Sequence, residues 1–79
     1  MRAGRAYRLI VTRQGRAPAW LASPGRVDHV EVVEIDSGEV VLFWDLAPVQ
    51  ASRLARALRE DLGRLEAEEF LTAWRSAQA

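Results

Sequence analysis

The segment VDHVEVVEIDSGEVVLFWD, residues 27–45, decides the fold. Residues 27–35 are rich in β-branched side chains, and residues 39–45 form a second apolar run. The loop Asp36-Ser37-Gly38 between them ends in glycine, which tolerates the left-handed backbone conformation that closes short hairpins. We therefore predict a β-hairpin with Gly38 in that conformation.

A first strand is expected upstream of this hairpin, over residues 6–13. Tyr7, Leu9 and Val11 occupy every second position there, which is the period of a strand in which one face is more apolar than the other. Residues 14–26 contain two prolines and two glycines and read as an irregular connection. Trp20 within this connection is expected to pack against the edge of the core.

Two helices are expected downstream of the hairpin. Asp45-Leu46-Ala47-Pro48 resembles a helix start, with proline in the first turn and Asp45 as the cap. The apolar residues that follow recur at helical spacing up to Gly63, where the first helix should end or bend. They are Ala51, Leu54, Ala55, Leu58 and Leu62. The second helix is predicted at about residues 66–76, with one apolar side made of Ala67, Phe70, Leu71 and Trp74.

The predicted fold class is therefore α+β. A small antiparallel sheet, made of a strand, an irregular connection and a β-hairpin, precedes two C-terminal helices that pack on one sheet face. The 79 residues, 1–79, are expected to form a single small domain. A chain of this size buries a modest core, and self-association is a common way to add buried area.

The amino-acid composition indicates the cellular compartment and the type of genome that the protein comes from. The absence of cysteine excludes disulfides, thiolate metal sites and a cysteine nucleophile, and it fits a reducing compartment. No apolar run reaches the length of a membrane span or of a signal-peptide core, so we expect a cytoplasmic protein that does not enter a membrane. The chain lacks lysine and asparagine but is rich in arginine and alanine, which indicates a GC-rich, bacterial genome.

The hairpin pattern predicts an interaction surface. If Ile35 and Glu39 pair across the turn, Val30 and Val32 share a face with Val40, Leu42 and Trp44. The opposite face then exposes an apolar patch, and such patches on small proteins mark interfaces. The predicted interface residues are Ile10, Val33, Val41 and Phe43. The alternative is that the connection at residues 14–26 folds over this face and brings Trp20 with it.

Charge is distributed unevenly along the chain, although the net charge is zero. Residues 1–26 hold six arginines and no acid, and residues 27–45 hold six acids and no lysine or arginine. A basic patch of Arg2, Arg5, Arg8, Arg13 and Arg16 predicts binding of nucleic acid. We favour pairing of the basic strand with the acidic hairpin, within one chain or across a dimer, because nucleic-acid-binding domains usually carry a basic excess. Arg53, Arg56 and Arg59 are expected on a solvent-exposed helix face.

Catalytic and ligand-binding signatures are weak. His29 is the only histidine, and a catalytic triad would need Ser23 or Ser37 beside it, for which nothing local argues. The sequence has no metal-ligand spacing and no phosphate-binding glycine loop, so we predict no catalytic residue, metal or cofactor. A small enzyme with its site near His29 and Asp45 is the weakest hypothesis.

These observations favour a non-enzymatic module that binds another protein or associates with itself as a homodimer, in an accessory or regulatory role. The alternative is a nucleic-acid-binding module that uses the N-terminal arginines.

Overall fold

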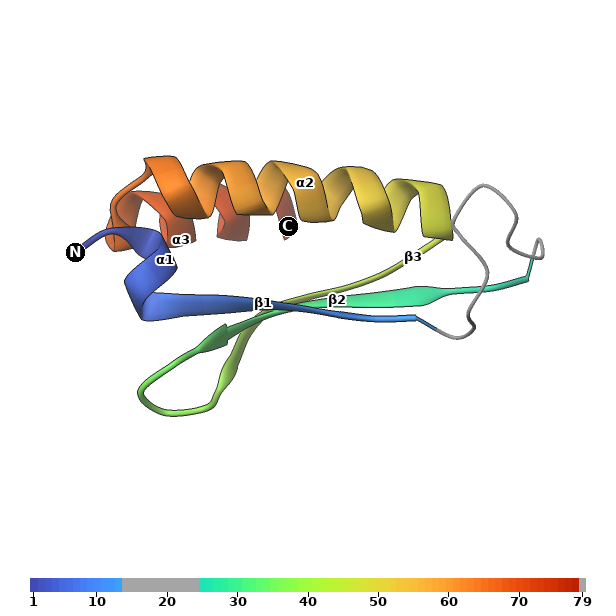
Figure 1. The fold of residues 1–79 in the computed structure, drawn as a ribbon, viewed down its shortest axis with the longest axis horizontal. Helices are drawn as coiled ribbons and strands as arrows, with labels where there is room; N and C mark the ends of the chain where they lie inside the picture. The colour runs from blue at the N-terminus through green and yellow to red at the C-terminus, as the bar shows by residue number, and fades with distance from the viewer. Residues whose placement is uncertain (14–24, 79) are drawn as a thin grey trace.

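A computed structural model describes residues 1–13 and 25–78 of the chain. The sheet contains β1 (Tyr7–Thr12), β2 (Asp28–Glu34) and β3 (Val40–Leu46), which are antiparallel and lie in that order. The helices are α1 (Ala3–Ala6), α2 (Pro48–Arg64) and α3 (Ala67–Gln78), and they form a second layer over one face of the sheet (Figure 1). The α+β arrangement predicted from the sequence is confirmed. Most of the expected connection, including Trp20, lies outside the described residues.

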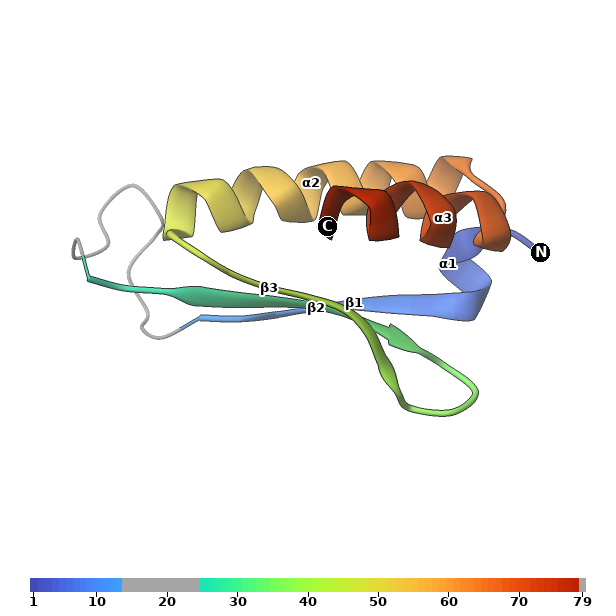
Figure 2. The ribbon, with the colours of Figure 1, turned by 180° about the vertical axis from the view of Figure 1, so that it is seen from behind.

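The core lies between these two layers. Val30, Val32 and Leu42 point from the sheet toward the helices and are almost completely buried. The predicted helical stripes meet them: Ala51, Ala55, Leu58 and Leu62 of α2 and Phe70 of α3 are buried. Figure 2 shows α3 beside α2, so that both helices contribute to the same apolar interior.

The start of α2 differs from the expectation in one respect. Pro48 occupies the first turn as predicted, but Ala47 is the N-cap and no side chain caps the helix. Asp45 is not the cap, because β3 continues to Leu46, which pairs with Asp28 of β2. Asp45 therefore belongs to the sheet. The end of α2 at Arg64 lies one residue beyond Gly63.

The hairpin loop contains Gly38 with φ of 75°, as predicted. Its closing pair differs from the expected one, because the amide of Glu34 donates to the carbonyl of Glu39 at 2.8 Å. The Ile35 amide turns away and donates to the carbonyl of Ala6 at 2.9 Å. Ile35 and Glu39 are therefore not partners, and the loop is one residue longer than expected.

A β-bulge in β3 changes which valines face the core. Val32 pairs with Leu42 but the next residue, Val33, pairs with Val40, so Val41 is the additional residue. Val41 packs against the core cluster, whereas Val40 is 51% exposed. The predicted orientation of these two side chains is therefore wrong: Val40 faces away from the core and Val41 contacts it.

The short helix α1 was not expected from the sequence and is held by contacts with the α2–α3 turn. The Ala3 amide donates to the carbonyl of Leu65, and the Ala67 amide donates to the carbonyl of Met1. Gly4 allows this close approach, because a Cβ atom there would lie 3.1 Å from the Leu62 carbonyl oxygen. Within the described residues, no helix has the length and apolar character needed to cross a membrane.

Candidate functional site

The most prominent surface is the sheet face turned away from the helices, which we call the outer sheet face. No described helix or strand lies over it (Figure 1). Because side chains alternate along strands, the residues next to the buried positions face outward. The outer sheet face comprises Arg8, Ile10 and Thr12 of β1, His29, Glu31 and Val33 of β2, and Val40, Phe43 and Asp45 of β3.

Apolar side chains dominate two of the three cross-strand rows of this face. Val33 lies between Arg8 and Val40 in one row, and Glu31 lies between Ile10 and Phe43 in the next. Ile10 is 40% exposed and Phe43 is 45% exposed, so both leave apolar area in contact with solvent. The two rows therefore combine four apolar side chains with Arg8 at one edge and the Glu31 carboxylate near the centre.

The third row places the only histidine beside an acid. His29 Nδ1 contacts the Asp45 carboxylate across the strands, and its ring stacks on Phe43 with centroids 5.9 Å apart. The Ser37 hydroxyl is engaged elsewhere, accepting a hydrogen bond from the Glu39 amide in the hairpin loop at 3.2 Å. Ser23 lies outside the described residues. The geometry thus pairs His29 with Asp45, but brings no described serine to them.

The structure places only some of the predicted interface residues on the outer sheet face. Ile10, Val33 and Phe43 lie on the outer sheet face, as the strand pattern predicts. Val41 is half-buried against the core because of the bulge, and Val40 stands in its place opposite Val33. Sequence reasoning missed Val40 because two adjacent valines give no indication of which one faces the core.

The predicted basic patch is divided among different parts of the molecule. Arg2 and Arg5 belong to the α1 region, where the Arg2 guanidinium donates to the Arg64 carbonyl at 3.0 Å. Arg8 lies on the outer sheet face, whereas Arg13 follows β1 and lines a cavity against α2. Arg16 falls outside the described residues.

Pairing of the basic strand with the acidic hairpin within one chain, the first of the two expected forms, is absent from the described residues. The ion pairs there are Met1–Glu66, Arg26–Asp28, His29–Asp45 and Arg64–Asp61. Arg8 and Glu31 therefore remain without an ion-pair partner in residues 1–13 and 25–78. Groups of three or more metal-ligating side chains are also absent from these residues.

No protein-family model, curated protein or solved structure matches the chain.

Proposed function

We propose that the protein is a non-enzymatic self-associating module in which two copies pack through their outer sheet faces. The observation that carries the proposal is the apolar group formed by Ile10, Val33, Val40 and Phe43 on a face that no described element covers. Burying such a group against a second copy removes apolar area from water, the main driving force for association. The role would be accessory or regulatory, in a cytoplasmic setting that suits a cysteine-free chain.

The charges on the same face favour a second copy as the occupant. A two-fold interface uses one patch twice, so the patch must be complementary to itself. The outer sheet face carries Arg8 on one edge strand and the carboxylates Glu31 and Asp45 on the other two strands. Arg8 and Glu31 lack ion-pair partners within the described chain. Arg8 of one copy is therefore available to pair with Glu31 of the second copy.

The dimensions of the sheet indicate a reversible association. Three strands of six or seven residues project to about 300 Å², using the usual strand spacing and rise per residue. Stable complexes bury about 800 Å² of accessible surface on each partner, well above the projected area of this face. We therefore expect a dimer that dissociates on dilution, with a dissociation constant on the order of micromolar.

Nucleic-acid binding through the N-terminal arginines has less support. Arg2, Arg8 and Arg13 belong to three different surfaces, so they would not follow one phosphate backbone together. A heterologous protein partner on the outer sheet face is the other alternative. Sedimentation velocity over a dilution series distinguishes these cases, because self-association alone raises the mass of the purified chain with concentration.

A further inference from the structure

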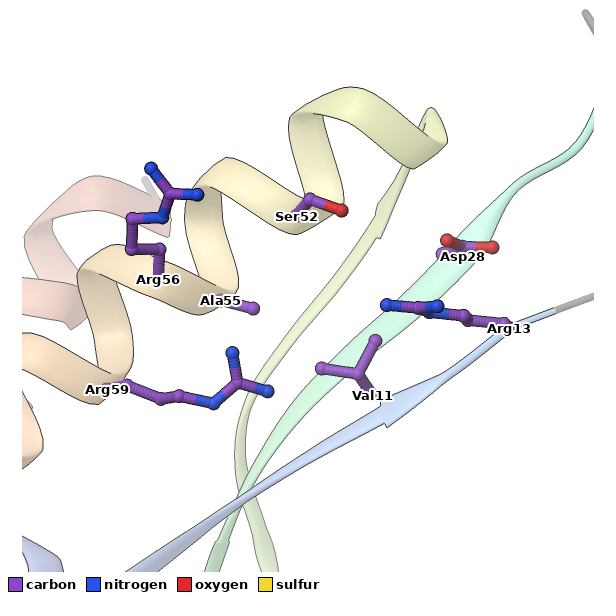
Figure 3. A pocket seen from close by; sticks show the side chains of 7 residues that line it. All are labelled: Val11, Arg13, Asp28, Ser52, Ala55, Arg56 and Arg59. Atoms are coloured by element: carbon purple, nitrogen blue, oxygen red, sulfur yellow. The ribbon is translucent and has the colours of Figure 1, made fainter. Parts of the chain in front are cut away.

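A second site lies on the opposite side of the sheet, where the end of β1 and the start of β2 face α2. A cavity of about 260 Å³ opens there. It is lined by Val11, Arg13, Asp28, Ser52, Ala55, Arg56 and Arg59 (Figure 3). The lining residues come from both layers of the fold and include three arginines and one acid, Asp28.

Two of the arginines approach the cavity from opposite walls. Arg13 extends from the sheet and Arg59 from α2 into the gap between them, while Arg56 lies along the helix at the rim (Figure 3). None of the three forms an ion pair with a described residue. All three side chains are exposed, and three positive charges around one cavity attract an anion.

The single carboxylate of the cavity does not cancel this positive charge. Asp28 is 2% exposed and receives two hydrogen bonds from the guanidinium of Arg26, at 2.9 and 3.0 Å. These bonds also hold the pKa of Arg26 above its ordinary value. Asp28 and Arg26 form a neutral pair, so the field in the cavity is set by Arg13, Arg56 and Arg59.

The helix provides the remaining features of an anion site. Ser52, Ala55, Arg56 and Arg59 follow the spacing that places residues on one side of a helix. Ala55 is buried and its small side chain leaves space beneath the arginines, while the Ser52 hydroxyl adds a neutral donor. Pockets for whole organic ligands usually measure about 300–1,000 Å³, so this cavity, just below that range, has room for a small anionic group.

We propose that this cavity binds a phosphate group, with the guanidinium groups of Arg13 and Arg59 as the principal ligands and Ser52 as an additional donor. Arginine suits this role because its planar fork donates two parallel hydrogen bonds to phosphate oxygens. The group could belong to a small phosphorylated molecule or to a nucleic-acid backbone, which share this chemistry. The site is independent of the outer sheet face, which lies on the other side of the sheet.

The test measures thermal unfolding of the full chain in inorganic phosphate and in chloride at matched ionic strength. We expect phosphate to raise the melting temperature of the wild type and of Arg53→Gln, the matched control, since Arg53 is on α2 but does not line the cavity. Arg13→Gln and Arg59→Gln should each weaken phosphate binding by on the order of tenfold or more, because each removes charged hydrogen-bond donors.

A second measurement does not depend on the variants. In the wild type, phosphate should shift the backbone amide resonances of Val11, Ser52 and Ala55 in a saturable manner, with the outer sheet face unaffected. Absence of a phosphate-specific effect in both measurements, or an equal response of the wild type and both glutamine variants, overturns the proposal. If the site binds phosphate, competition by a single-stranded oligonucleotide supports a phosphodiester backbone as the source, and lack of competition excludes that source in favour of a small phosphorylated molecule.

Discussion

His29 and Phe43 stack on the outer sheet face with their ring centroids 5.9 Å apart and their planes inclined by 24°. His29 on β2 also contacts Asp45, which lies two residues beyond Phe43 on β3, so Phe43 packs against a side chain that its own strand holds in place. This arrangement holds an aromatic ring at the surface in one orientation, which reduces the conformational entropy that association would cost. Phe43 is therefore the anchor of the proposed interface.

Arg8 and Glu31 provide a charge-exchange test of the two-fold arrangement. Arg8→Glu alone and Glu31→Arg alone place like charges across the interface, and each should raise the dissociation constant by roughly tenfold or more. An equimolar mixture of the two variants restores opposite charges at both contacts and should associate about as well as the wild type. Light scattering of each variant and of the mixture gives the result, and a mixture no heavier than its components would rule out this pairing.

Two glycines should respond to alanine in opposite directions. Gly38 has φ of 75°, so Gly38→Ala is expected to lower the free energy of unfolding by about 1–2 kcal/mol. Gly63 lies within α2, and a Cβ atom there would meet nothing within 4 Å. Gly63→Ala should therefore raise the free energy of unfolding by about 0.5–1 kcal/mol. Urea titration of both variants measures the difference, and effects of equal sign would contradict the hairpin geometry.

Asp61 links the two long helices. Its carboxylate accepts hydrogen bonds from the Trp74 indole at 3.1 Å and from the Arg64 guanidinium at 2.8 Å. Asp61→Ala leaves the half-buried indole without this acceptor and should lower the free energy of unfolding by about 1–2 kcal/mol. Glu60→Ala is the control, because Glu60 is exposed on the same helix. Equal stability of the two variants in urea would show that the hydrogen bonds of Asp61 contribute nothing to the free energy of unfolding.

Glu66 should make stability depend on pH. The Met1 ammonium lies 2.9 Å from its carboxylate, and the hydrogen bond and charge of that group hold the pKa of Glu66 below its ordinary value. A carboxyl whose pKa is lowered by folding contributes stability above the unfolded-state pKa, and this stability is lost as pH falls through the folded-state pKa. The stability difference between the wild type and Glu66→Gln, measured in urea, should therefore shrink on acidification. A difference that stays constant from about pH 6 to below the ordinary glutamate pKa of about 4.3 would contradict this linkage.

The elements that sequence reasoning recovered are those with a strong local signal. The apolar stripe of α2 and the glycine-closed hairpin follow from residues close together in the chain, so their periodicity suffices. The bulge in β3 could not be predicted, because Val40 and Val41 are equally apolar and only the packed sheet distinguishes them. The helix α1 was missed because its four residues carry no periodicity. Its position depends on a distant segment, since the Ala3 amide donates to the Leu65 carbonyl and the Ala67 amide donates to the carbonyl of Met1, just before α1.

The candidate sites also contain some residues that local sequence patterns place and others that only the folded chain brings together. Ile10, Val33 and Phe43 could be assigned to one face from strand alternation alone. The convergence of Arg13 with Arg59 depends on how α2 crosses the sheet, which no local pattern encodes. Arg56 and Arg59 are exposed to solvent, as the helical spacing predicts, and they also line this cavity, which the spacing alone does not indicate.

Sedimentation velocity of the wild type and of Phe43→Glu, over a dilution series around micromolar concentration, tests the central claim most directly. Val49→Glu is the matched control, because Val49 is 44% exposed, close to the value for Phe43, but lies on α2. We predict that the wild type and Val49→Glu dimerise as concentration rises, while Phe43→Glu stays monomeric with an unchanged circular dichroism spectrum. A wild type that remains monomeric throughout the series, or a Phe43→Glu variant that dimerises as well as the control, would contradict the proposed interface.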